Sequence, residues 1–160
     1  MSSLRLGCIL AALVAVLGAA GPTAPSADAV RAEVQQFFKS YVEAQNKVDA
    51  SAIMEMVSKK PGVASISMGE ITRGWEDIRK DVDSIVGSEG VMKIAIGTID
   101  VEPLGPNFAL AFAPCTITLA VAQGGLQVRG AVTLIVEKSE GKWKLIHEHT
   151  SAQITENEGK

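Results

Sequence analysis

The chain has few of the groups that would tie it to a disulfide framework or to a polyanion. Its only cysteines are Cys8 and Cys115. Cys8 belongs to an N-terminal apolar segment that we expect to be removed, and the remaining cysteine cannot form an internal disulfide. The 15 basic residues are outnumbered by 18 acidic ones. Nucleic acid and anionic membranes both require a basic patch, so neither is an expected partner.

Motifs of covalent catalysis and cofactor binding are also missing. The sequence contains no G-x-S-x-G nucleophile motif and no glycine-rich phosphate loop. The only histidines, His147 and His149, lie two positions apart, so on a strand both imidazoles would face the same side. Two imidazoles can bind zinc, but Cys115, Glu137 or Asp100 would have to supply a third ligand from another strand. We expect no metal and no cofactor.

The first 20 residues are typical of a secretory signal peptide. Arg5 precedes an apolar run from Leu6 to Leu17, and the small residues Gly18 to Gly21 follow it. The run is shorter than the roughly 18 apolar residues that a membrane span requires. We expect cleavage after Ala20, or alternatively after Ala27, with export to the periplasm or the extracellular space and no membrane contact afterwards. Without Arg5, 14 basic residues face 18 acidic ones, a net charge of −4.

The rest of the chain predicts helices first and strands afterwards. Apolar residues at three- and four-residue spacing after Ser26 indicate a helix of roughly five turns. Asp49 can cap a second helix, and Gly74 opens a third. The expected strands cover residues 63–68, 70–73, 91–102, 108–122, 126–138 and 142–151. This order favours an α+β domain with helices packed on one side of a strongly curved sheet.

We expect four segments along the chain: a signal peptide (1–20), a linker (21–27), the domain (28–154) and a flexible polar tail (155–160). The last strand of the domain holds both histidines. At period two, one face of this strand would carry Trp143, Leu145, His147, His149 and Ser151. That face runs from a large apolar group to two imidazoles, as the wall of a half-polar pocket would. Glu148 and Thr150, on the other face, are candidates for a dimer surface.

Two stretches carry a resemblance to a known family. They are the helix start Gly74-Trp75-Glu76-Asp77-Ile78 and the ending Gly141-Lys142-Trp143-Lys144-Leu145-Ile146-His147-Glu148-His149-Thr150-Ser151. The chain resembles the SnoaL-like branch of the nuclear-transport-factor-2-like superfamily over about residues 28–154, and its ending is similar to that of the calcium/calmodulin-dependent kinase II association domain. The resemblance implies a cone of three N-terminal helices on a strongly curved, mainly antiparallel sheet. It also implies a homodimer or larger homo-oligomer, commonly built through the outer face of the sheet. It implies no single activity, because the fold hosts several enzyme classes and non-catalytic assembly domains.

One enzyme of this superfamily, ketosteroid isomerase, can be compared residue by residue. Its oxyanion tyrosine lies on the first helix, where Tyr41 occupies a matching place. Its general base is an aspartate on the first strand, where this chain has Ala64-Ser65-Ile66-Ser67. Its second oxyanion donor is an aspartate on the penultimate strand, where residues 129–134 contain no acid. Without a base, this isomerase chemistry is not expected.

The candidate ligand-binding residues are Tyr41, Trp75, Arg129, His147 and His149. Arg129 would hold a carboxylate if it points inward and would have no special role if it is exposed. Tyr41 and Trp75 suit a core position with a polar tip, and Cys115 suits a buried, inert position. The first hypothesis is a domain that binds a small, partly apolar molecule. The alternatives are a lyase, isomerase or hydrolase with His147 or His149 as acid or base, and a non-catalytic oligomerisation domain.

Overall fold

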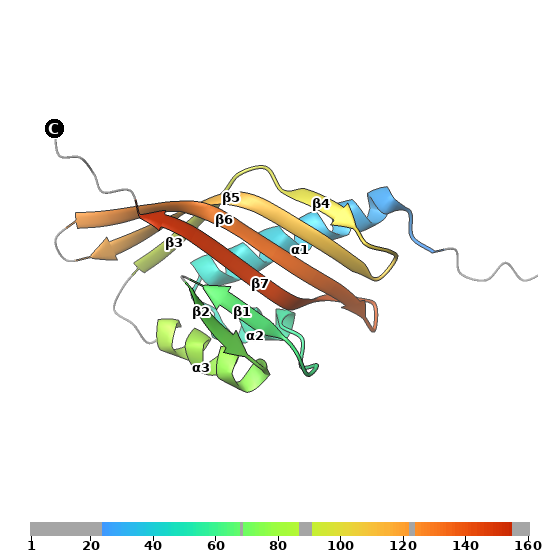
Figure 1. The fold of residues 1–160 in the computed structure, drawn as a ribbon, viewed down its shortest axis with the longest axis horizontal. Helices are drawn as coiled ribbons and strands as arrows, with labels where there is room; N and C mark the ends of the chain where they lie inside the picture. The colour runs from blue at the N-terminus through green and yellow to red at the C-terminus, as the bar shows by residue number, and fades with distance from the viewer. Residues whose placement is uncertain (1–23, 68, 87–90, 122–123, 155–160) are drawn as a thin grey trace, which may run out of the picture.

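The computed structural model describes residues 24–67, 69–86, 91–121 and 124–154. The helices in this part are α1 (Ala27–Asn46), α2 (Ala50–Met56) and α3 (Trp75–Val86). The strands are β1 (Ala64–Ser67), β2 (Glu70–Arg73), β3 (Val91–Ile96), β4 (Asp100–Pro103), β5 (Phe108–Val121), β6 (Gly124–Ser139) and β7 (Lys142–Ile154). The element order matches the expected one, with the helices early and the long strands late (Figure 1).

Side-chain caps begin the first two helices, as the sequence predicts. The Ser26 side chain accepts a hydrogen bond from the Ala29 amide, and Asp49 accepts one from the Ala52 amide at 2.9 Å. Cleavage after Ala27, the alternative signal-peptide site, would remove the Ser26 cap and the first residue of α1. The signal peptide itself and the tail beyond residue 154 lie outside the described residues.

The strands form one sheet in the order β2-β1-β7-β6-β5-β3, and β4 also pairs with β5. All pairings are antiparallel except the parallel contact between β1 and β7. β7 pairs antiparallel with β6 after a two-residue turn at Glu140 and Gly141. Both turn residues have positive φ, 52° and 75°, as tight hairpin turns require. Figure 1 shows α1 crossing the sheet on one face.

The strand predicted over residues 91–102 is divided into β3 and β4, which pair with different parts of β5. Between them, the Gly97 amide donates to the Pro114 carbonyl at 2.9 Å. The proline ring lies so close that a Cβ on Gly97 would be 2.8 Å from its Cγ. Because Pro114 has no amide hydrogen for a neighbouring strand, the break between β3 and β4 falls where that donor is missing.

The core lies between the helices and one face of the sheet, which we call the inner face. Its sheet side combines small residues on β5 (Ala109, Ala111, Ala113) with larger ones on β6 (Val132, Leu134, Val136). These pack against buried residues of α1, including Val34 and Phe38. Cys115 is buried in this layer, as expected, and burial raises the pKa of its thiol. Small residues on β5 allow the helix to approach the sheet closely.

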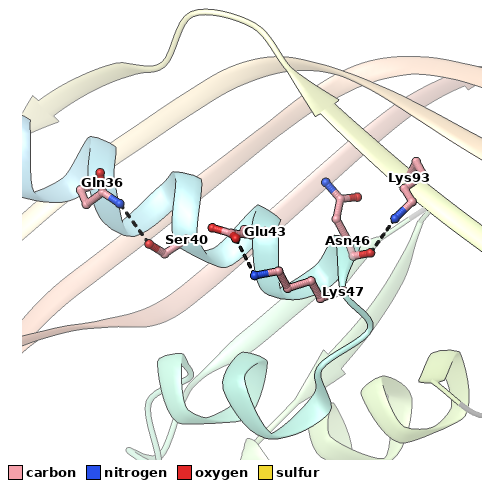
Figure 2. Close-up of polar contacts among 6 residues, drawn as sticks. All are labelled: Gln36, Ser40, Glu43, Asn46, Lys47 and Lys93. Carbon is pink, nitrogen blue, oxygen red and sulfur yellow. Dashed lines mark hydrogen bonds and ion pairs between the residues drawn. The ribbon is translucent and has the colours of Figure 1, made fainter.

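Hydrogen bonds hold the C-terminal end of α1 against β3. The Asn46 side chain donates to the Ile94 carbonyl at 2.8 Å and accepts from the Ile94 amide at 2.7 Å. The Lys93 ammonium also donates to the Asn46 carbonyl at 2.9 Å (Figure 2). Figure 2 also shows the side-chain pairs Gln36–Ser40 and Glu43–Lys47 along the same helix. These contacts fix the last turns of α1, which carry Tyr41 and Gln45, relative to the sheet.

Candidate functional site

A β-bulge in β7 decides which of its side chains face the helices. Val136 of β6 lies opposite Leu145, and the preceding residue Ile135 lies opposite His147. Ile146 is therefore an extra residue with no partner of its own on β6. Because side chains alternate between the two faces with period two, one extra residue exchanges the faces of everything that follows.

Beyond the bulge, Glu148 and Thr150 take the inner face that Trp143 and Leu145 occupy before it. Their cross-strand partners are consistent with this, since Glu148 lies opposite Leu134 and Thr150 opposite Val132, both buried core residues. The prediction that the two histidines share a face with Trp143 and Leu145 is therefore wrong. The inner-face positions expected to hold imidazoles hold a carboxylate and a hydroxyl.

The Glu148 carboxylate accepts a 2.8 Å hydrogen bond from the phenolic hydroxyl of Tyr41. Tyr41 lies on α1 and is only 4% exposed. Burial raises the pKa of Glu148, although hydrogen bonds from Tyr41, Gln45 and Thr150 act in the opposite direction. Burial also raises the pKa of Tyr41 well above its usual value, and the nearby negative charge of Glu148 adds to this effect. Tyr41 is thus a proton-bearing donor across the physiological pH range.

A cavity of about 410 Å³ surrounds this pair, between α1, α3 and the sheet. We call it the Tyr41 cavity. Its polar lining residues are Tyr41, Gln45, Ser65, Ser67, Glu70, Thr72, Asp81, Ser84, Glu148 and Thr150. Its apolar lining residues are Ile78, Val82, Ile85, Met92, Ile94, Ile117 and Val132. A cavity with a polar side and an apolar side suits a molecule that has both kinds of surface.

The short strands β1 and β2 supply much of the polar side. In the parallel pairing, Ser65 lies beside Glu148 and Ser67 beside Thr150, so these four side chains share the inner face. Thr72 lies opposite Ser65 on β2 and donates a 2.5 Å hydrogen bond to a carboxylate oxygen of Asp81 on α3. This contact joins the edge of the sheet to the helix that covers the cavity.

Of the five predicted ligand-binding residues, only Tyr41 lines this cavity among the residues that the structure describes. Trp75 begins α3 and donates its indole N–H to the Met54 carbonyl at 3.4 Å. The Lys59 ammonium lies 4.7 Å from the centre of the Trp75 ring, in a separate groove between α3 and the loop before β1. These contacts of Trp75 join α3 to α2 and to the loop that follows α2.

Arg129 and His149 are exposed on the outer face of the sheet, the face that also carries Phe112 and Thr133. Arg129 thus does not point into the Tyr41 cavity, and the carboxylate contact expected of an inward arginine has no support there. His147 is half-buried on the same outer face. It lines a groove of about 390 Å³ whose other residues include Ser58 and Glu137. Ligand binding by either histidine stays a prediction.

Glu148 is the site residue that the period-two pattern misplaced. One signal for the bulge was present, because Leu145 and Ile146 are adjacent apolar residues that interrupt a strict alternation.

In the described part of the chain, no group of three His, Cys, Asp or Glu side chains is arranged to hold a metal ion. No helix there is long and apolar enough to cross a membrane.

Comparisons with known proteins agree with this architecture. A family model described as a SnoaL-like domain matches residues 34–155. A comparison with curated proteins found no match. A Shewanella oneidensis protein of unknown function, described as NTF-2 like, is 23% identical, with a TM-score of 0.60 over 76% of this chain and 98% of that one.

Two further structures carry functional names. A Novosphingobium aromaticivorans protein named as a candidate scytalone dehydratase has a TM-score of 0.70 at 9% identity, over 78% of this chain and 84% of that one. A Xanthomonas campestris protein named as a candidate calcium/calmodulin-dependent kinase II association domain has a TM-score of 0.62 at 23% identity. The match covers 76% of this chain and 86% of that one. At such identities the likeness shows the fold alone. With its helices, curved sheet and family match together, the chain belongs to the SnoaL-like domain family and has a nuclear-transport-factor-2-like fold.

Proposed function

We propose that this protein binds a small, partly apolar molecule in the Tyr41 cavity, with Glu148 and Tyr41 as its polar anchor. The observation that carries the proposal is the Tyr41–Glu148 hydrogen bond inside a cavity of about 410 Å³. That volume lies within the range of about 300–1,000 Å³ usual for small-molecule pockets. A half-buried carboxylate without a cationic partner is costly to maintain, so the position of Glu148 in a cavity favours a binding role.

The Glu148 carboxylate keeps capacity for a ligand. A carboxylate has about four acceptor positions, and the described hydrogen bonds to Glu148 come from Tyr41, Gln45 and Thr150. The Tyr41 hydroxyl donates to Glu148 and also bonds to the Gln45 side chain, so it orients the Glu148 carboxylate toward a ligand. The apolar residues Val82, Met92 and Ile117 would contact the rest of the molecule.

Amide NMR spectra titrated with a library of small aromatic and alicyclic fragments would test the proposal. We expect the resonances of Ser65, Thr72 and Thr150 to shift, and the shifts to weaken in Glu148→Gln. A matched control is Glu102→Gln, which removes the same charge from an exposed position of β4 outside the cavity. Shifts confined to the outer face, around His149 and Thr133, would contradict the proposal.

A second candidate function is acid–base catalysis with Glu148 in the role first considered for the histidines. One observation favours it, namely that burial raises the pKa of a carboxyl group that lines a cavity. A carboxylate in such a setting is a stronger base than usual and can take a proton from a carbon next to a carbonyl group. β-Hydroxy carbonyl compounds, which lose water after such a proton abstraction, are the first substrates to test. Turnover that falls about 100-fold or more in Glu148→Gln, while binding remains, would support catalysis.

We also propose export and a homodimer formed through the outer face of the sheet. In support of a dimer, Phe112 and Ile71 are 43% and 55% exposed. They lie at the two ends of a row of outer-face residues that continues through Thr133, His149 and Ile66. Light scattering would test the dimer, which Phe112→Lys should weaken.

Cell fractionation with and without residues 1–20 would test export.

A further inference from the structure

The ionisable side chains that line the Tyr41 cavity are acidic, with no basic counterpart. Glu70 on β2, Asp81 on α3 and Glu148 on β7 all contribute to its surface. Among the described lining residues there is no lysine, arginine or histidine. Carboxylates from three separate elements therefore give the cavity a negative potential, which low-dielectric walls strengthen.

The basic residues that neighbour the lining residues in the chain do not line the cavity. On β2, Arg73 lines the separate groove beside Trp75. On α3, Lys80 pairs with Asp77 at 2.6 Å and Arg79 pairs with Asp83 at 2.9 Å, both on the exposed side of the helix. On β3, Lys93 donates to the backbone carbonyl of Asn46. None of these cations lines the cavity.

Glu148 is the most enclosed of the three acids, and its hydrogen-bond partners are neutral. Tyr41, Gln45 and Thr150 are the groups that bond to its carboxylate, and no described ion pair includes it. A carboxylate partly removed from water without a cationic partner is costly, and an opposite charge at close range reduces that cost. An anionic ligand would increase it.

From this charge distribution we infer that the ligand of the Tyr41 cavity is a small organic cation, a protonated amine on an apolar body. The inference rests on the proposed binding function and names the chemical class of its ligand. The ammonium group lies beside Glu148, and the apolar body lies toward Val82 and Met92. These two residues and Gln45 also line an adjoining recess of about 50 Å³, otherwise lined by apolar side chains. The recess extends the apolar side of the cavity.

Three probes of nearly equal size test the sign of the charge: benzylamine, benzyl alcohol and benzoate. Their affinities are measured by NMR titration near neutral pH, on the wild-type protein, Glu148→Gln and the control Glu102→Gln. We expect benzylamine to bind about tenfold or more tightly than benzyl alcohol, on the scale of one charged hydrogen bond. We expect benzoate not to bind. The ratio of the benzylamine affinity to the benzyl alcohol affinity should be smaller in Glu148→Gln and unchanged in Glu102→Gln.

The outcomes separate this inference from the proposed function. Equal affinity for benzylamine and benzyl alcohol, with resonance shifts around the cavity, would overturn the cation inference and leave the binding function standing. Tighter binding of benzoate would do the same. An equal loss of preference in Glu102→Gln would mean that only the overall charge matters, which also overturns it. No cavity shifts with any of the probes or with the fragment library would overturn both.

Discussion

The hydroxyl of Tyr41 on α1 donates a 2.8 Å hydrogen bond to the carboxylate of Glu148 on β7, 107 positions further along the chain. The bond joins the helix to the sheet inside the cavity. Tyr41 is buried and Glu148 is half-buried, so each depends on the other for part of its hydrogen bonding. This pair makes the candidate site sensitive to small chemical changes.

Tyr41→Phe removes one oxygen atom and keeps the ring. We expect a loss of about 1–3 kcal/mol in the free energy of unfolding, because the variant leaves a half-buried acceptor with one donor fewer. The pKa of Glu148 should rise further, since the Tyr41 hydrogen bond lowers it. Denaturant unfolding measures the first effect, and NMR titration of the Glu148 carboxyl measures the second.

Gln36→Ala, an exposed change on the same helix (Figure 2), is the matched control and should change the unfolding free energy by less than about 0.5 kcal/mol. An unchanged Glu148 pKa in Tyr41→Phe would show that the hydrogen bond does not form in solution.

Glu148→Gln should make the protein more stable at neutral pH. Burial raises the folded-state pKa of Glu148 above its ordinary value of 4.5, so the native state holds this proton more tightly than the unfolded chain does. The contribution of Glu148 to stability is therefore full below the unfolded pKa and is lost as the pH rises through the folded pKa. The amide side chain of the variant carries no charge and avoids this loss.

The check is the difference in melting temperature between wild type and Glu148→Gln, measured from mildly acidic to neutral pH. Taking this difference removes the pH dependence that the other titrating groups contribute equally to both proteins. The melting temperature of the variant should rise relative to that of wild type as the pH rises. A relative fall would mean that Glu148 is stabilised as a carboxylate.

Benzylamine affinity should fall on acidification. Protonation of Glu148 removes the negative charge closest to the ammonium group, and its raised pKa places this change above the range of an ordinary glutamate. The dissociation constant is measured at neutral and mildly acidic pH. The fall should be smaller in Glu148→Gln, and an equal fall in both proteins would assign the effect to other groups.

Gly130→Ala should be strongly destabilising. A Cβ at Gly130 would lie 1.9 Å from the Ser151 carbonyl oxygen, so the backbone of β6 or β7 would have to move. We expect a cost of about 2 kcal/mol or more, on the scale of overpacking. Gly97→Ala meets the ring carbon of Pro114 at 2.8 Å and should cost less, because a ring pucker can adjust more easily than a strand. Denaturant unfolding ranks the two variants, and a reversed order would contradict this account.

The structure confirms the order of elements that residue patterns predicted. Helical spacing of apolar residues, the side-chain caps at Ser26 and Asp49, and the turn at Glu140–Gly141 are local signals, and local backbone chemistry acts over a few residues. The pairing of β7 with β6 follows from the same turn. The α+β class and the family resemblance could therefore be inferred from sequence.

The site was decided by tertiary structure. One unpaired residue, Ile146, moves Glu148 to the inner face and the histidines to the outer face, and only the pairing with β6 reveals that it is unpaired. The parallel contact of β1 with β7 brings Ser65 beside Glu148, although the two are far apart in the chain. Sequence determined which segments are helices and strands because those preferences are local. Tertiary structure decided which side chains meet, because a face depends on register, and register is set by the neighbouring strand.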